Sequence, residues 1–197
     1  CALPISELEA EYEPGTKTAY HLVNYGFILG EIVRRMTGKP IEQYMEDHIF
    51  RPLGMRNSWL GLPREQLPRA AELYAGHSDQ NSTAILFRSA RHAVLPAATL
   101  NSTARDLAIF YQALINGGVY GNKRIIEEKT LENALKVQFA GHDHTFEGYV
   151  RWGLGFLLGG EKPAEYAERA PSYGRKSSVA TFGHPGQRSS LSWAERE

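Results

Sequence analysis

The sequence predicts a mixed fold of the α/β (α+β) class, in which a helical region is followed by part of an antiparallel sheet. Apolar residues recur at helical spacing in the first half of the chain, with glycine and proline at the expected helix ends. Short runs typical of strands follow residue 150. Because strands bury their faces only against neighbours, the two or three strands predicted here form an incomplete sheet. We therefore expect residues 1–197 to be part of a larger domain.

Four helices are expected, over residues 24–37, 40–50, 102–115 and 127–136. The first has apolar residues at positions 25, 28, 29, 32, 33 and 36, and Gly38 suits its C-terminal cap. Pro40 suits the first turn of the second helix. Ser102 to Asp106 has the pattern of an N-terminal cap and opens the third.

Strands are expected at Trp152–Leu158, Val179–Phe182 and Ser189–Trp193. Pro185 cannot donate a ladder hydrogen bond, so its strand is expected at a sheet edge. The aromatic rings of Trp152 and Phe156 are expected in the core. The polar stretch Glu161–Lys176 indicates a surface excursion, and Trp59–Pro96 indicates ordered loop with short elements.

Composition excludes several classes of partner. Lys and Arg total 22, Asp and Glu total 22, and the basic residues are scattered, so no nucleic-acid partner is expected. The longest apolar stretches are too short to span a bilayer, which predicts a soluble protein without a membrane span. The one cysteine cannot form an internal disulfide, and a cytoplasmic location is favoured. No cofactor is expected.

None of the serines lies in a recognisable nucleophile motif. A Ser-x-x-Lys nucleophile needs its lysine one helical turn later, within reach of the hydroxyl. No Ser or Thr has Lys at that spacing; Ser102 and Ser172 are each followed there by arginine, which does not act as a base. Gly76–Gln80 lacks the second glycine of a Gly-x-Ser-x-Gly elbow. A thiol activated by the α-amine of Cys1 is a weaker alternative.

His142 and His144 have a spacing that could bind zinc. Their neighbours Gly141 and Asp143 are typical of an exposed loop, so no metal site is predicted.

Several segments, in one order along the chain, resemble the serine β-lactamase and penicillin-binding-protein superfamily, and within it the class C-like esterase branch of family VIII carboxylesterases. The matching stretches are 14–16, 20–21, 25–35, 52–55, 61–63, 101–108, 152–156 and 182–186. The resemblance implies a partial β-lactamase-like (transpeptidase-like) domain over 1–197 that lacks the N-terminal nucleophile region and the C-terminal strands and helix.

The resemblance also implies roles for individual residues. In this family a serine activated by the lysine of Ser-x-x-Lys forms an acyl-enzyme, and a tyrosine shares the proton transfer; here that catalytic residue would be Tyr20. A phenol is normally protonated near neutral pH, so Tyr20 would need a neighbouring cation to act as a base. Leu22 stands where class C β-lactamases usually have asparagine, which favours an esterase.

His184-Pro185-Gly186 matches the His-x-Gly that esterases of this branch often carry where β-lactamases have Lys-Thr-Gly. By this resemblance His184 would line the substrate site and Gly186 would permit close backbone approach. The N–H of Gln187 would be one oxyanion donor.

The predicted function is a serine hydrolase of small carboxylic esters, with the nucleophile outside this chain. The predicted partners are a small ester substrate and, as one option, a second chain carrying Ser-x-x-Lys. Two alternatives stay open: a non-catalytic β-lactamase-like subunit or binding module, and a β-lactamase or D-amino peptidase of the same superfamily.

Overall fold

A computed structural model describes residues 5, 7–71, 90–166, 173–174, 177–186 and 191–196. The chain divides into two compact units, which are treated separately below. Unit 1 comprises Cys1–Leu8 and Leu22–Asp106, and unit 2 comprises Glu9–His21 and Leu107–Glu197.

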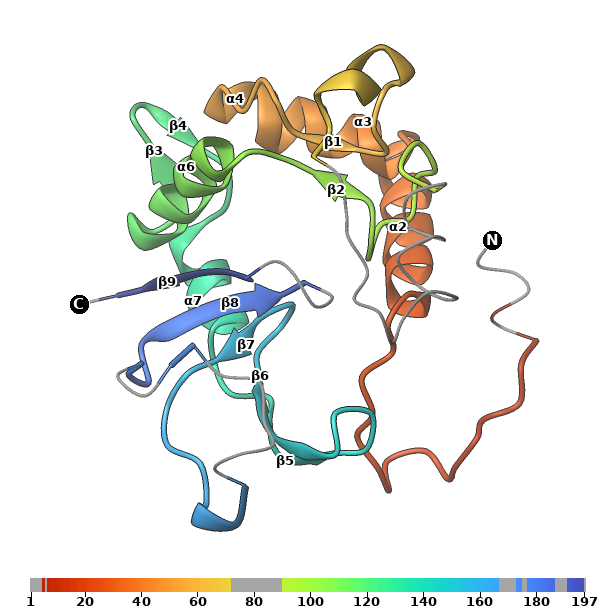
Figure 1. The fold of residues 1–197 in the computed structure, drawn as a ribbon, viewed down its shortest axis with the longest axis vertical. Helices are drawn as coiled ribbons and strands as arrows, with labels where there is room; N and C mark the ends of the chain where they lie inside the picture. The colour runs from red at the N-terminus through yellow and green to blue at the C-terminus, as the bar shows by residue number, and fades with distance from the viewer. Residues whose placement is uncertain are drawn as a thin grey trace. The chain divides into compact units, whose positions relative to one another are not determined.

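Unit 1 contains the predicted helices of the first half of the chain (Figure 1). Its elements are α2 (Asn24–Thr37), α3 (Ile41–Met45), the π-helix η1 (Glu46–Phe50), α4 (Arg51–Leu53), the 3₁₀ helix η2 (Arg64–Arg69) and the antiparallel pair of β1 (Trp59–Leu60) with β2 (Leu100–Asn101). The prediction for α2 is confirmed at both ends, and Gly38 caps it in the left-handed conformation with a φ of 73°. The second predicted helix continues through η1 and α4, with Gly54 as its left-handed cap.

The apolar stripe of α2 lies at the surface. Ile28, Leu29 and Ile32 are 43–55% exposed and Met36 is 80% exposed, and Gly26 is the buried residue of this helix. A helix with a regular apolar face normally buries that face against another element. The face of α2 therefore has the character of a contact surface.

A buried polar network holds β1 near the start of the helix α6 (Ala104–Ile115). Ser58 Oγ donates to Asp106 Oδ2 at 2.9 Å and lies 2.7 Å from Ser102 Oγ, and the backbone N–H of Asn57 donates to the same carboxylate oxygen at 2.8 Å. Thr103 Oγ1 accepts from the N–H of Asp106, which confirms the predicted cap. Ser58 is only 1% exposed, so its hydroxyl is a structural group.

Unit 2 is built on a five-stranded antiparallel sheet of order β5-β6-β7-β8-β9 (Figure 1). Its strands are β5 (Phe139–Asp143), β6 (Gly148–Trp152), β7 (Leu157–Leu158), β8 (Thr181–Pro185) and β9 (Leu191–Glu195). The remaining elements are the hairpin of β3 (Val119–Tyr120) with β4 (Lys123–Arg124), the helix α7 (Glu128–Ala134) and the 3₁₀ helix η4 (Ala164–Tyr166).

The sheet corrects three predictions. The single strand predicted at Trp152–Leu158 is two short strands, because Gly155 adopts a φ of 82° and the N–H of Gly153 closes a turn onto Phe156 O. β5 was not predicted, and the sheet has five strands where two or three were expected. Tyr173, predicted in a surface excursion, is buried and donates its hydroxyl to Leu157 O at 2.9 Å.

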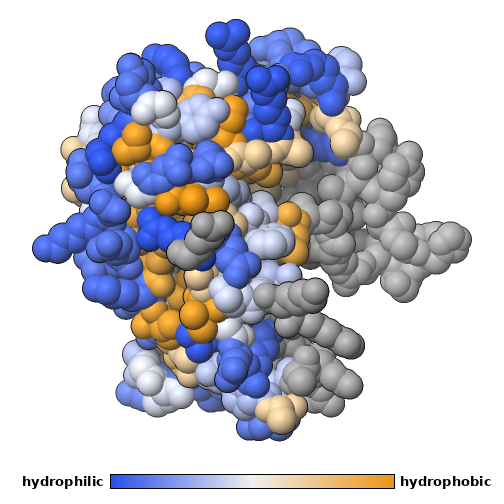
Figure 2. Space-filling view, turned by 90° about the vertical axis from the view of Figure 1, so that its left-hand side faces the viewer, coloured by the Kyte–Doolittle hydropathy of each residue, from blue (hydrophilic) through white to orange (hydrophobic). Residues whose placement is uncertain are grey.

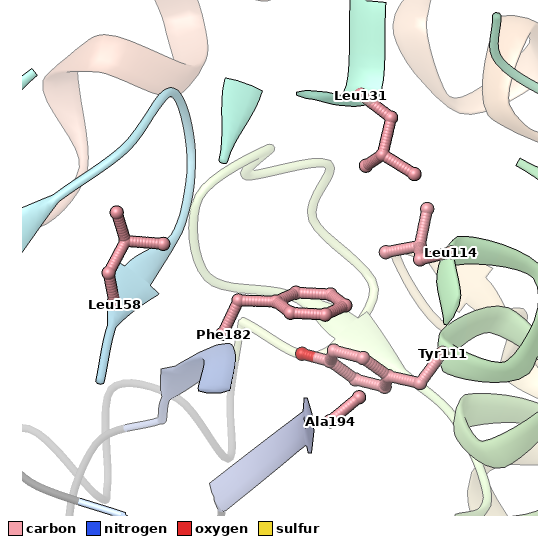
Figure 3. Packing of buried hydrophobic residues seen from close by; sticks show 6 residues of the cluster. All are labelled: Tyr111, Leu114, Leu131, Leu158, Phe182 and Ala194. Atoms are coloured by element: carbon pink, nitrogen blue, oxygen red, sulfur yellow. The ribbon is translucent and has the colours of Figure 1, made fainter. Parts of the chain in front are cut away.

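The main core of unit 2 packs α6 and α7 on the sheet. Phe182 of β8, 1% exposed, lies 6.0 Å between ring centroids from Tyr111 of α6, whose hydroxyl donates to Ser192 O (Figure 3). The other buried members are Leu114, Leu131, Leu158 and Ala194. Burial of the phenol raises the pKa of Tyr111 above its ordinary value. This core fixes β8, and with it the backbone of His184.

Hydrophobic side chains also reach the molecular surface, as the orange areas of Figure 2 show. In unit 2 the exposed ones include Leu154, Val179 and Leu191. None of the helices in the part of the chain that the structure describes is long and apolar enough to cross a membrane.

Candidate active site

The β5–β6 hairpin holds the segment that carries Tyr20. The N–H of His144 donates to Thr18 O at 3.0 Å, and Thr145 Oγ1 donates to Tyr20 O at 3.0 Å. The N–H of Tyr20 donates to Asp143 Oδ1 at 3.3 Å. Because these bonds fix the backbone on both sides of residue 20, they also fix the direction in which the Tyr20 side chain leaves the chain.

Asp143 is the centre of this arrangement. Its side chain is fully buried, and Oδ1 also accepts from the N–H groups of Thr145 and Phe146 at 2.9 and 3.0 Å. Oδ2 is buried and has no hydrogen-bond partner among the described residues. Asp143 therefore ties the backbone of Tyr20 to the turn that follows β5.

The ring of Tyr20 lies in a cluster of aromatic side chains of unit 2. Its centroid is 5.0 Å from that of Phe146, 5.5 Å from that of Trp152 and 5.6 Å from that of His184. Trp152 stacks on Tyr20 with an angle of 15° between the ring planes and on His184 with an angle of 25°. The structure thus brings together the two side chains, Tyr20 and His184, that the sequence proposes for the site.

The hydrogen bonding of His184 defines its neutral form. Nδ1 lies 2.7 Å from the carbonyl oxygen of Pro185, which can only accept, so Nδ1 carries the hydrogen and Nε2 keeps its lone pair. Burial lowers the pKa of His184 below that of an exposed histidine, and the bond to the Pro185 carbonyl opposes this in part. His184 is therefore suited to act as a neutral group that orients a substrate or accepts a proton at Nε2.

The position of β8 corrects the prediction from Pro185. β8 lies between β7 and β9 and is not at the edge of the sheet. β7 pairs with it only at Phe182 and Gly183, whereas Pro185 pairs with Leu191 of β9. The strand tolerates proline at its end because β7, which is two residues long, does not extend to that position.

Two backbone positions were predicted from the His-x-Gly motif, and the structure describes the first of them, Gly186. Gly186 directly follows β8 and is exposed. Gln187 lies outside the described residues, so its oxyanion role stays a prediction. The glycine that the sheet requires is Gly183, where a Cβ would collide with Ser192 O and Trp193 of β9.

Sequence reasoning missed Asp143, Phe146 and Trp152 as members of the site. Trp152 was predicted as core; it packs against the buried cluster that includes Val150 and Leu157 while staying partly exposed, and its ring also contacts those of both proposed site residues. Its membership of the matching stretch 152–156 was the available signal. Nothing in the local sequence around Asp143 indicated that its carboxylate would bind a backbone N–H near the start of the chain.

A separate depression of about 560 Å³ lies in unit 1, lined by residues of α3, η1, α4 and β1. Neither Tyr20 nor His184 lines it. Because the residues that line it do not include the proposed proton-transfer groups, it is not the candidate site.

Lowering the pH should destabilise the fold partly through His184. Since the pKa of His184 is lower in the folded state, the unfolded chain binds this proton more readily. The stability that comes from keeping His184 neutral is present above its unfolded-state pKa of about 6.5. It is lost as the pH falls towards the lower pKa that His184 has in the folded state. In urea unfolding between about pH 7.5 and about pH 5, His184→Gln should lose less stability than the wild type. The exposed-site control His92→Gln should match the wild type, and equal losses in all three proteins would contradict the assignment.

The fold is that of the β-lactamase-like serine hydrolases and penicillin-binding proteins. The family model described as Beta-lactamase matches residues 5–197, and the chain belongs to that family.

Individual relatives include both peptidase-like and esterase-like proteins. A protein of Salmonella enteritidis PT4 (strain P125109) with the provisional name D-alanyl-D-alanine carboxypeptidase is 30% identical over 92% of this chain and 43% of its own length. The crystal structure of a family VIII carboxylesterase is 31% identical with a TM-score of 0.73 over 93% of this chain and 51% of its own. The crystal structure of a penicillin-binding-protein homologue from Caulobacter crescentus is 25% identical with a TM-score of 0.78. This match covers 95% of this chain and 52% of the homologue. The chain thus spans about half the length of these relatives.

Proposed function

We propose that the protein to which this chain belongs is a serine hydrolase that cleaves small carboxylic esters through an acyl-enzyme. The serine and lysine of Ser-x-x-Lys are supplied from outside these residues, either elsewhere in the same polypeptide or by a second chain. Tyr20 transfers protons, and His184 orients the substrate. The observation that carries this proposal is the 5.6 Å separation of the Tyr20 and His184 rings, which come from opposite ends of the sequence.

The proposed chemistry assigns each group a step. The serine hydroxyl attacks the ester carbonyl while its proton passes to the lysine and Tyr20 pair, and the same pair protonates the departing alcohol. Water then attacks the acyl-enzyme by the reverse route. The N–H of Gln187 and that of the serine would stabilise the oxyanion. His184, neutral with Nε2 as an acceptor, would bind a donor group of the substrate.

Two features support a nucleophile supplied from outside these residues. No Ser-x-x-Lys occurs in the sequence, and the chain spans about half the length of its relatives. The exposed apolar face of α2 offers a surface on which a further segment would pack. Residues 1–197 would then be part of a larger domain, as the sequence predicts.

A D-alanyl-D-alanine carboxypeptidase is the second candidate, because the curated relatives carry that provisional name at about the same identity as the esterase structure. Leu22 in place of the asparagine of class C β-lactamases, and His184 in place of a lysine, favour esters over this alternative. A non-catalytic subunit is the third candidate.

The test uses the full-length protein beside the isolated chain. Both are incubated with a fluorophosphonate probe, p-nitrophenyl acetate, a D-Ala-D-Ala peptide and a chromogenic cephalosporin. We expect the full-length protein to hydrolyse the ester fastest and to be labelled on a serine that a lysine follows three residues later, and the isolated chain to show neither. Faster cleavage of the peptide would support the second candidate. Labelling of a serine within residues 1–197 would overturn the proposal, and no labelling of either protein would support the third candidate.

A further inference from the structure

The turn end of the β5–β6 hairpin gathers three side chains that can bind a metal ion. His142 lies in β5 and is partly exposed, Asp143 ends the strand and is fully buried, and His144 follows it as an exposed residue of the turn. Glu147 lies in the turn that leads to β6. The sequence had predicted an exposed loop here. That prediction is wrong for Gly141, His142 and Asp143, which lie in β5, and it is confirmed for His144, which is exposed in the turn.

The three side chains converge. His142 Nε2 is 3.5 Å from Glu147 Oε2, and the rings of His142 and His144 are 4.9 Å apart between centroids. One ligand atom from each of the three residues lies within 4.8 Å of the others. Two ligands of a tetrahedral zinc ion are about 3.3 Å apart, given bond lengths of about 2.0–2.1 Å. His142 Nε2 and Glu147 Oε2, 3.5 Å apart, already have nearly this spacing. His144 is exposed, so a rotation of its side chain can bring a ring nitrogen to the same distance.

The backbone of the turn gives an independent indication. Glu147 has a φ of 50°, and it is the one non-glycine residue with a positive φ in the described parts of the chain. Glycine or asparagine adopts this conformation at lower cost. The residue found there carries a carboxylate that reaches His142. A strained position occupied by a ligating side chain indicates a use for that side chain.

We propose that His142, His144 and Glu147 bind a divalent transition-metal ion of the zinc class, with water in the remaining position. Two imidazole nitrogens and one carboxylate suit Zn²⁺, Co²⁺ or Ni²⁺, whereas Mg²⁺ and Ca²⁺ prefer oxygen ligands. The ion would join β5 to its turn. The same turn holds the backbone of Tyr20 through Asp143 and Thr145, so the bound ion would rigidify the support of the candidate active site.

The experiment measures metal binding directly. The full-length protein is stripped with EDTA, exchanged into chelator-free buffer and titrated with ZnCl₂ by isothermal calorimetry. We expect a Zn²⁺-binding event that is lost in His142→Ala and His144→Ala and weakened in Glu147→Gln, with a thermal midpoint that rises with Zn²⁺ concentration. His92→Ala and Glu161→Gln change exposed residues of the same types and should bind as the wild type does. Excess Mg²⁺ should not compete.

The visible spectrum of the Co²⁺-loaded protein provides a second readout, because four- and five-coordinate Co²⁺ absorbs far more strongly than hexa-aqua Co²⁺. This absorption should disappear in His142→Ala. If an alanine variant does not fold without metal, the comparison is repeated with His144→Asn. Equal Zn²⁺ stoichiometry and affinity in wild type and the His142→Ala/His144→Ala double variant would overturn the proposal. So would the absence of any Zn²⁺ binding by the wild type, which would leave His142 and Glu147 an ordinary polar pair.

Discussion

Replacing Tyr20 by phenylalanine in the full-length protein should lower kcat for short-chain esters by about 10²–10⁴-fold, with little change in KM. Phenylalanine keeps the ring that packs on Phe146, Trp152 and His184 and removes only the phenolic oxygen. Because a general acid–base group acts in the transition state, its loss affects the chemical step more than substrate binding. Stopped-flow acylation with p-nitrophenyl acetate measures that step.

The matched comparison is His184→Ala, which we expect to reduce kcat less and to change the preference among acyl groups. This difference follows from the roles proposed for the two side chains, since orientation is shared with the rest of the site, whereas proton transfer is assigned to the lysine and Tyr20 alone. Thermal unfolding of both variants controls for damage to the aromatic cluster. Wild-type kcat and an unchanged pH profile in Tyr20→Phe would show that the family's tyrosine motif has been assigned to the wrong residue.

Local structure was predictable from the sequence where the residues that determine it all lie within one helix or one cap. The bounds of α2 follow from the spacing of its apolar residues and from Gly38, and the start of α6 follows from Thr103. The choice of Tyr20 and His184 followed from motifs, and their proximity in unit 2 accords with it.

Long-range pairing was not predictable in the same way. β5 contains Gly141 and Asp143, which are uncommon in strands, and it becomes a strand because all five of its residues pair with β6. The position of β8 between two neighbours depends on where β7 ends, which no property of Pro185 reveals. The exposure of the α2 stripe is also invisible in its periodicity, because periodicity indicates that a face is apolar but not what covers it.

Asp143→Ala should lower kcat by about 10²-fold, since displacement of a catalytic group by about 1 Å has an effect of that size. The change removes the acceptor of three N–H groups, those of Tyr20, Thr145 and Phe146. Each buried donor left without a partner costs about 1–3 kcal/mol, so the variant should also unfold at a lower urea concentration. Asp143→Asn keeps Oδ1 as the acceptor and exchanges Oδ2, which has no hydrogen-bond partner in the described ranges, for a neutral amide. It should therefore retain more of the activity and the stability than Asp143→Ala does, because the three N–H groups keep their acceptor.

A double-mutant cycle separates positioning from general destabilisation. If Asp143 acts on catalysis only by holding the backbone of Tyr20, then Asp143→Ala should have little further effect on kcat once Tyr20 is phenylalanine, because no phenolic oxygen remains to be positioned. The loss of stability should persist in that background, since it arises from unpaired N–H groups that both proteins contain. Fully multiplicative effects on kcat, measured well below the unfolding temperature, would mean that Asp143 affects catalysis independently of the Tyr20 hydroxyl. Non-additivity in kcat together with additivity in unfolding free energy is the pattern expected of a carboxylate that positions the proton-transfer group.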